Sequence, residues 1–264
     1  IESRHLGLVT AEELSDIGEK IRSLGALAEA HLDIDGMLHS ANQAPPIEGA
    51  PLPKRDGPPR VRIAVARDRA FCFLYEENLE LLEALGCELL YFSPLSDERL
   101  PEGIGGLYLC GGYPELHAAA LSENRSMLRS VRERIAAGLP TLAECGGFLY
   151  LHERLCDFPM AGVIRARAFE TKKLQRFGYL TLEAREHNLL CARGEQIRAH
   201  EFHYYDSSDC GGGFLARKAS RPEEYPCVHA SETLYAGFPH LYFPGNLAAA
   251  QSFVGKAAAY AKNH

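Results

Sequence analysis

The 264-residue sequence lacks several features that mark common classes of protein. It has no GxxxxGK[ST] motif, so we expect no binding of ATP by a P-loop. It has no apolar run of 18 residues, which argues against a transmembrane helix and a membrane partner. No lysine and arginine cluster is long enough for a nucleic-acid interface, and the net charge of −7 points the same way.

The eight cysteines also lack the spacing of a metal site or of a disulfide framework. No CxxC pair or zinc-finger spacing occurs, and several cysteines lie within apolar runs. We therefore expect reduced thiols, a cytoplasmic location and no bound metal. The first five residues do not form a signal peptide, and the sequence does not begin with methionine, so we expect a fragment of a longer chain.

Proline and glycine divide the chain into two parts. Residues 43–60 are rich in both and show no apolar periodicity, which indicates a linker. Residues 1–42 contain a capping-box pattern at 10–13, followed by apolar residues at helical spacing from Leu14 to Leu24. This amphipathic helix is too small for a domain, so we expect it to pack on a partner. Residues 61–264 then form the main domain.

The main domain begins with short apolar strands that alternate with helices. This pattern predicts an α/β fold with a mainly parallel sheet and helices on both faces. From about residue 161 short strands joined by polar turns predict an added antiparallel portion, and a helix closes the chain. The expected strands are 61–66, 87–92, 107–110, 141–144, 163–169, 179–183, 196–204 and 214–219, and the expected helices are 74–85, 122–137 (capped by Ser122) and 247–262.

One cysteine lies on a predicted turn between a strand and a helix. Residues 139–151 read Leu-Pro-Thr-Leu-Ala-Glu-Cys-Gly-Gly-Phe-Leu-Tyr-Leu, so Cys145 ends an apolar run and Gly146 and Gly147 follow it. Small residues after a nucleophile let backbone approach the substrate, and a helix N-terminus favours thiolate. We predict that Cys145 is a nucleophile. The alternative is a buried cysteine that ends a core strand.

A second glycine turn, Gly111-Gly112-Tyr113, follows another predicted strand. A cysteine nucleophile needs an oxyanion hole for the tetrahedral intermediate, and the backbone N–H groups of this turn are plausible donors. The carboxyl ends of parallel strands share one edge of the sheet, so we expect Gly111 and Gly112 to approach the Cys145 sulfur. The alternative is an ordinary strand-to-loop turn, where glycine is common.

Three of the 11 histidines are candidates for the base, and the others are expected to be surface or core residues. His200 and His203 are three residues apart in an expected strand and so lie on opposite faces. His240 lies at a strand end before the last helix, and the residue two positions later is Tyr242 rather than an acid. A Cys-His dyad or an acid from elsewhere is therefore implied. The run His-Glu-Phe-His lacks the HExxH spacing of zinc peptidases, which argues against metal chemistry.

Several motifs together resemble the cobyrinic acid a,c-diamide synthase family. They read DRAFCFLYEENLE (68–80), FSPLSDERLP (92–101), LCGGYPE (109–115), AECGGFLY (143–150) and HEFHY (200–204). The likeness covers roughly residues 61–255 and implies the C-terminal glutamine amidotransferase domain of that family, in its cobyrinate/cobyric acid branch. The implied fold is the class I, flavodoxin-like α/β fold. Members use a Cys-His pair without the usual glutamate, which agrees with Tyr242.

This resemblance implies Cys145 as the nucleophile and His240 as its activating histidine, with His203 as the rival base. It implies hydrolysis of glutamine and supply of ammonia for ATP-dependent amidation of corrin carboxylates in cobalamin biosynthesis. We assign oxyanion and substrate binding to Gly111, Gly112, Gly146, Tyr113, His203 and Glu201.

The resemblance also bears on the rest of the protein. Residues 1–42 resemble the end of the family's N-terminal ATP-dependent synthetase domain. We expect no cofactor in this chain, and ATP and Mg²⁺ in the part of the synthetase domain that lies outside it. The oligomeric state is left open, with a homodimer as one outcome.

Two departures from the family pattern leave other functions open. Cys110 stands where the family usually has a glycine, and Ala199 and Tyr205 flank a motif that usually has glycine and serine there. A paralogue that amidates another tetrapyrrole is therefore an alternative. A cysteine hydrolase of the same fold and a catalytically silent binding module are two more.

Overall fold

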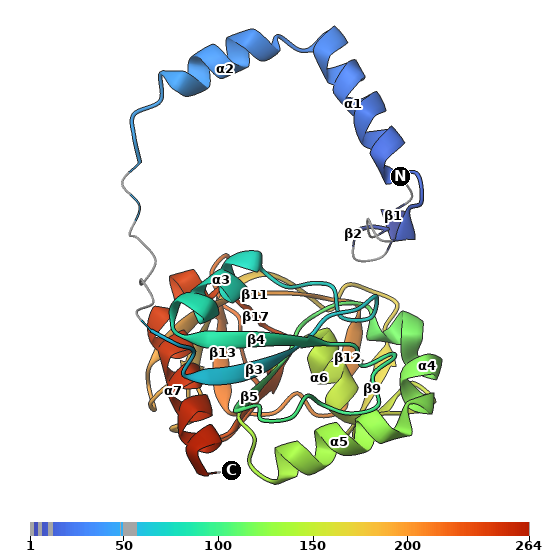
Figure 1. Ribbon diagram of the computed structural model, residues 1–264, viewed down its shortest axis with the longest axis vertical. Coiled ribbons are helices and arrows are strands. Elements are labelled where there is room, and N and C mark those ends of the chain that lie inside the picture. Colours follow the sequence, from blue (N-terminus) through green and yellow to red (C-terminus); the bar gives the residue numbers. More distant parts are fainter. Residues whose placement is uncertain (1–2, 5–6, 10–12, 48, 50–56, 264) are drawn as a thin grey trace. The chain divides into compact units, whose positions relative to one another are not determined.

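The computed structural model describes residues 3–4, 7–9, 13–47, 49 and 57–263. Contacts divide the chain into two compact units, Ile1–Leu52 and Pro53–His264, and each is described by itself (Figure 1). The expected capping box at residues 10–13 lies largely outside the described residues. The described helices are α1 (Ile17–His31), α2 (Ile34–Asn42), α3 (Glu76–Ala84), α4 (Ala118–Glu123), α5 (Arg125–Ala136), α6 (Gly146–Leu151) and α7 (Leu247–Asn263), with 3₁₀ turns η2 (Pro114–His117) and η3 (Phe243–Gly245).

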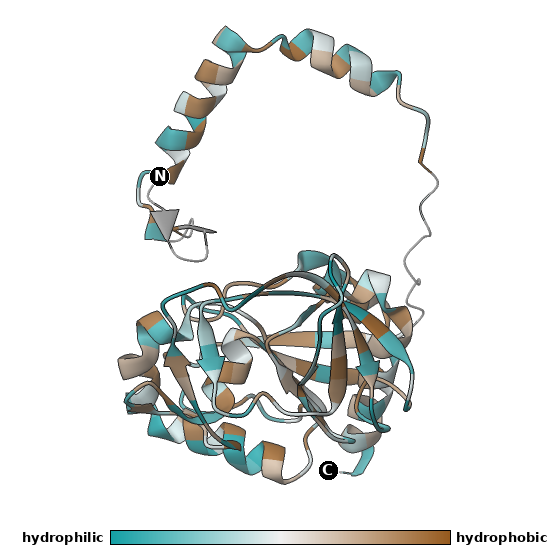
Figure 2. Cartoon of the chain, turned by 180° about the vertical axis from the view of Figure 1, so that it is seen from behind, coloured by the Kyte–Doolittle hydropathy of each residue, from teal (hydrophilic) through white to brown (hydrophobic). Residues whose placement is uncertain are grey.

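The first unit consists mainly of two amphipathic helices. A short strand pair, β1 (Ser3–Arg4) and β2 (Gly7–Leu8), precedes α1 and α2. Hydrophobic and hydrophilic residues are interspersed around both helices (Figure 2), and neither helix buries a residue. Asp33 caps α2 by accepting a hydrogen bond from the Gly36 N–H at 2.9 Å. Local sequence therefore accounts for these helices better than packing does.

A six-stranded sheet forms the centre of the second unit, in the order β15-β16-β6-β5-β3-β4. All its neighbours are parallel except β15 and β16. Counted along the chain, its five parallel strands have the flavodoxin-like order 2-1-3-4-5. The helix α3 contacts β4, α7 contacts β3 and β5, and α6 contacts β5, β6 and β16. The strands are β3 (Val61–Ala66), β4 (Cys87–Phe92), β5 (Gly106–Leu109), β6 (Thr141–Glu144), β15 (His229–Ala230) and β16 (Leu234–Gly237).

Two further sheets are present, of which the five-stranded one is fully antiparallel and the four-stranded one is mixed, with β7 and β9 parallel. A five-stranded antiparallel sheet has the order β14-β13-β10-β11-β17, and a four-stranded sheet has the order β12-β9-β7-β8. Along β11 exposed or half-buried residues alternate with buried ones, so one face of this strand is internal. The strands are β7 (His152–Leu155), β8 (Phe158–Pro159), β9 (Ile164–Glu170), β10 (Arg176–Ala184), β11 (Gln196–His203), β12 (Tyr205–Ser207), β13 (Phe214–Lys218), β14 (Glu224–Cys227) and β17 (His240–Leu241).

The helix expected at residues 122–137 is two helices, and Ser122 does not cap the second one. Ser122 lies inside α4, where its hydroxyl donates to the Ala119 carbonyl at 2.7 Å. Asn124 caps α5 instead, because its Oδ1 accepts from the Met127 N–H at 3.3 Å. The Asn124 amide also donates to two carbonyls before α4, which holds it at the break between the helices.

Candidate active site

Cys145 lies on a strained turn between β6 and α6. Its backbone has φ 47° and ψ −99°, a region that residues with a side chain seldom occupy. The Cys145 N–H donates to the Gly237 carbonyl at 2.8 Å, and the Cys145 carbonyl accepts from the Leu149 N–H at 2.9 Å. These bonds to β16 and α6 hold the strained turn in place and account for the strand-to-helix elbow that the sequence predicts.

The turn after β5 meets both the Cys145 elbow and His240. A Cβ atom on Gly146 would lie 3.0 Å from the Gly112 nitrogen, so the residue after Cys145 packs directly on this turn. A Cβ atom on Gly111 would lie only 2.6 Å from Cε1 of the His240 ring. Glycine is therefore required at both positions, because any side chain would separate the turn from the elbow or from the imidazole.

Tyr113 ends this glycine turn. Its N–H donates to the Ala70 carbonyl at 2.9 Å, and its own carbonyl accepts from the Leu116 N–H at 3.1 Å. Tyr113 directly precedes η2 and is half-buried. Its backbone therefore anchors the turn to the loop that follows β3, while a contact between its side chain and substrate stays a prediction.

His240 begins the edge strand β17 of the five-stranded sheet and is 5% exposed. Its ring packs edge-to-face on Phe73, with ring centroids 4.9 Å apart. Its Nδ1 lies 3.9 Å from Oε2 of Glu144, the residue before Cys145. Burial lowers the pKa of His240 to about 3, and the nearby His200 and His203 act in the same direction.

Burial favours the neutral form of both the Cys145 thiol and the His240 imidazole. Burial raises the pKa of Cys145 well above its usual value, and the carboxylate of Glu115 acts in the same direction. The sequence led us to expect that the helix start would favour thiolate. Here the removal of the sulfur from water outweighs the dipole of the six-residue helix α6. A nucleophilic role for Cys145 would therefore require loss of the thiol proton.

His203 and Glu201 lie on the internal face of β11. Glu201 is fully buried, and its Oε1 is 3.1 Å from the His203 Nε2. The other carboxylate oxygen of Glu201 accepts from the Tyr225 hydroxyl and pairs with the Lys218 ammonium at 3.8 Å. The His203 ring stacks on Phe238 with centroids 3.7 Å apart. Both predicted substrate-binding side chains thus have protein partners, and their contact with substrate stays a prediction.

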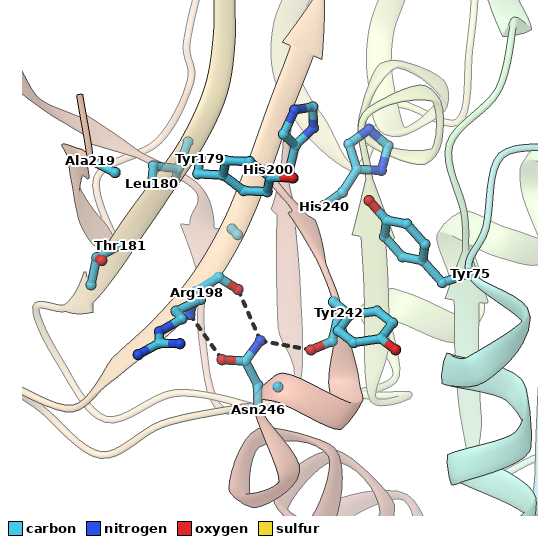
Figure 3. A pocket seen from close by; sticks show the side chains of 12 residues that line it. Tyr75, Tyr179, Leu180, Thr181, Arg198, His200, Ala219, His240, Tyr242 and Asn246 are labelled. Atoms are coloured by element: carbon cyan, nitrogen blue, oxygen red, sulfur yellow. Dashed lines mark hydrogen bonds between the residues drawn. The ribbon is translucent and has the colours of Figure 1, made fainter. Parts of the chain in front are cut away.

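The other face of β11 borders a cavity of about 590 Å³ that reaches His240 (Figure 3). Tyr179, His200 and His240 are directly opposite one another on three adjacent strands. His200 therefore faces the cavity and His203 does not, which confirms the expected opposite orientation of these two histidines. Further lining residues include Tyr75, Arg198, Tyr242 and Asn246.

The chain matches the model of a known protein family. The CobB/CobQ-like glutamine amidotransferase domain matches residues 62–245, more than half of the chain. The chain belongs to this family. The amidotransferase domain therefore accounts for most of the second unit, as the resemblance to cobyrinic acid a,c-diamide synthases implied.

Curated proteins similar to this chain are named cobyrinate a,c-diamide synthases. A cobyrinate a,c-diamide synthase of Caldanaerobacter subterraneus subsp. tengcongensis is 38% identical over 251 residues, which are 91% of this chain and 55% of that protein. One from Thermoplasma volcanium is 37% identical over 274 residues, which are 99% of this chain and 58% of that protein. The chain thus spans little more than half the length of these relatives.

Solved structures confirm the class I amidotransferase-like α/β fold of the domain. PurLQS from Thermotoga maritima matches 77% of this chain and 98% of its own chain, with a TM-score of 0.52 and 16% identity. A glutamine amidotransferase matches 74% of this chain and 98% of its own, with a TM-score of 0.51 and 18% identity. At these identities the likeness concerns the fold alone.

The described part of the chain shows neither a membrane-spanning helix nor a metal-binding cluster. Among those residues, no helix is long and apolar enough to cross a membrane. The same residues contain no group of three or more histidine, cysteine, aspartate or glutamate side chains placed to hold a metal ion.

Two side chains around the candidate site were not predicted from the sequence, Glu144 and Phe73. Glu144 was noted only as a neighbour of Cys145, and Phe73 only as part of a motif. The available signal for Glu144 was a carboxylate in the last position of a fully buried strand, which is a rare place for an unpaired charge. Nothing in the sequence around Phe73 indicated a contact with a histidine 167 positions later.

Proposed function

We propose that this domain hydrolyses glutamine, with Cys145 as the nucleophile and His240 as the general base. One observation carries the proposal: the turn at Gly111 and Gly112 packs on both the His240 ring and Gly146, the residue after Cys145. This packing supports a site at the carboxyl edge of the sheet that combines the candidate nucleophile, the candidate base and backbone N–H groups.

The chemistry follows from these groups. The Cys145 sulfur attacks the side-chain amide carbon of glutamine while His240 takes the thiol proton. Backbone N–H groups of Gly112 and Gly146 donate to the oxyanion of the tetrahedral intermediate. The C–N bond then breaks, His240 returns the proton to the leaving nitrogen, and ammonia leaves a glutamyl thioester on Cys145.

Water completes the cycle. It attacks the thioester carbon while His240 takes its proton, the C–S bond breaks, and glutamate leaves. The proton returns to the Cys145 sulfur, which restores the neutral thiol that burial favours. Each turnover therefore converts glutamine and water to glutamate and ammonia.

We further propose that the ammonia is used to amidate corrin carboxylates in cobalamin biosynthesis, in the cytoplasm. The names of the relatives support this acceptor, and their greater length leaves room for a synthetase portion that binds ATP, Mg²⁺ and the corrin. The eight cysteines are all free, which agrees with a reducing compartment.

Replacement of the nucleophile tests the proposal. Cys145→Ala is expected to abolish release of glutamate from glutamine, and covalent capture of a glutamine-analogue electrophile at residue 145, seen by mass spectrometry, is expected to disappear. Cys191→Ala, at another buried cysteine, is the matched control and should retain both signals. In a full-length protein, ammonia-dependent amidation should survive Cys145→Ala. Release of glutamate at the parent rate by the Cys145 variant would exclude this mechanism.

A further inference from the structure

The short strand that carries His240 is held by buried side chains rather than by a second neighbouring strand. β17 contains only two residues and pairs with β11 on one side. On its other side the Leu241 N–H donates to Oε1 of Glu144 at 2.9 Å, and the Leu241 carbonyl accepts from the Asn78 amide at 2.8 Å. The Phe243 N–H donates to Oδ1 of Asn78 at 2.7 Å. Two side chains thus satisfy both backbone groups on the open edge of Leu241 and one N–H of the 3₁₀ turn that follows the strand.

Glu144 does more than bind this backbone. It is 1% exposed, and its second oxygen accepts from the Tyr108 hydroxyl at 3.0 Å and lies 3.9 Å from the His240 Nδ1. That separation is longer than a hydrogen bond, as catalytic contacts often are before substrate binds. A carboxylate at this distance in a buried site favours a positive charge on the imidazole, which forms when the thiol loses its proton.

We propose that Glu144 is the acid partner of His240, and that Glu144 and Asn78 together position this histidine. Both act through His240 and are positioning residues. The inference rests on the proposed glutaminase function and supplies the acid that Tyr242 does not. Tyr242 is 43% exposed and packs edge-to-face on Tyr75, so it does not act as a partner of the imidazole. Acid and nucleophile then come from consecutive residues of one elbow.

The charges around the pair agree with this assignment. Burial raises the pKa of Glu144 to about 8 and lowers that of His240 to about 3. Burial thus favours a neutral pair at rest, and the 3.9 Å between the Glu144 Oε2 and the His240 Nδ1 allows a proton on His240 to favour ionisation of Glu144 by Coulomb attraction. Of the other titratable groups near His240, His200 and Tyr75 line the same cavity. The charges of His203 and Glu201 act on the imidazole from the opposite face of β11.

A purely structural role for Glu144 is the competing explanation, and Glu144→Gln separates the two. Glutamine keeps an oxygen that accepts from the Leu241 N–H but loses the ability to ionise when His240 gains a proton. Positioning by charge predicts that kcat for glutamine falls about 10²-fold or more while KM stays within about threefold. Thr141→Val, an isosteric change at the other end of β6, is the matched control and should leave kcat within about threefold.

A second readout does not depend on turnover. In protein labelled with ¹⁵N-histidine, long-range ¹H–¹⁵N spectra report which ring nitrogen of His240 carries the proton. We expect the Nδ1–H tautomer in the parent and in Thr141→Val, and a mixture of tautomers in Glu144→Gln. Asn78→Ala, which removes both bonds to the 241–243 backbone, should broaden or shift the His240 signals and lower kcat.

The outcomes are distinguishable. Parent-like kcat and an unchanged tautomer in Glu144→Gln would overturn the inference, as would a fall in kcat without a change of tautomer. If the parent itself released no glutamate from glutamine, the proposed function would fail, while the tautomer measurement would still decide whether Glu144 orients His240.

Discussion

The six-stranded and five-stranded sheets of the second unit contribute to the candidate site in different ways. The six-stranded sheet delivers Cys145 from the end of β6, whose four residues are all buried and paired on both sides. The five-stranded sheet delivers His240 from an edge strand of two residues. Cys145 is thus placed by local backbone geometry, whereas His240 is placed by side chains 97 and 163 positions away from the backbone that they bind. A nucleophile can be encoded within a short segment, while its base depends on the finished fold.

The largest expected effect comes from a substitution in the glycine turn, which contacts both His240 of the five-stranded sheet and the Cys145 elbow of the six-stranded sheet. Gly111→Ala would bring a methyl group within 2.6 Å of the His240 ring, which must then move. We expect kcat for glutamine hydrolysis to fall by about 10²–10³-fold, the loss typical of a misplaced oxyanion or base group. Steady-state glutamate release measures this effect.

The matched control for this change is Gly255→Ala in α7. An alanine there meets no atom within 4 Å, and alanine is favoured in a helix, so activity should be unchanged and stability equal or higher. Parent-like kcat in Gly111→Ala would show that the His240 ring is not held against this turn.

An effect of intermediate size is expected on the free energy of unfolding as the pH changes. His240 of the five-stranded sheet and Glu144 of the six-stranded sheet contribute to it in opposite directions. His240 stays neutral when folded and gains a proton when unfolded below about pH 6.5, so its contribution to stability is lost as the pH falls from 6.5 toward 3. Glu144 has the opposite sign: its raised pKa lowers the free energy of unfolding as the pH rises from about 4.5 to 8. Each group contributes a slope of at most about 1.4 kcal/mol per pH unit.

Urea unfolding at pH 4, 5, 6, 7 and 8 measures both slopes. His240→Asn should flatten the acid side of the profile, and Glu144→Gln should flatten the neutral side. Burial also lowers the pKa of His152 to about 4, so part of the acid slope will remain in His240→Asn. Parallel profiles for the parent and both variants would contradict the assigned shifts.

The smallest expected effect concerns the scaffold of the six-stranded sheet. Asn124→Ala removes the cap of α5 and two bonds to neighbouring carbonyls. We expect the free energy of unfolding to fall by about 1–2 kcal/mol with kcat unchanged, because α5 lies outside the site. Thermal unfolding and glutamate release together check this, and a large loss of activity would mean that α5 helps to hold the elbow.

The sequence predicted the central sheet well. The bounds expected for 61–66, 87–92 and 141–144 coincide with β3, β4 and β6. These strands are short apolar runs because both of their faces are covered, and such runs are visible without knowledge of their partners. The Cys145 elbow was predictable for a similar reason, since strand, cysteine, glycines and helix follow one another directly.

The strands and side-chain contacts that the sequence did not predict depend on contacts between distant segments. The strands β7, β8, β12 and β14–β17 are two to four residues long, too short for a hydrophobic period to appear. β16 completes the parallel sheet and ends shortly before His240; the sequence predicted a strand end at His240 but not the bounds of this strand, and His240 instead begins β17. The partners of His240 come from the loop after β3 and from the end of β6, and no local pattern links them. The identity of the base therefore rested on the family resemblance.

Because Cys145 is buried and its raised pKa favours the protonated thiol, we expect this cysteine to resist oxidation. Peroxide attacks thiolate far faster than thiol, and oxidation beyond the first step is irreversible in most proteins. Cys145 is 6% exposed, and burial keeps its pKa high, so in the absence of substrate the sulfur is a poor target for oxidants. The burial that keeps the thiol protonated thus protects the residue that we propose as the nucleophile.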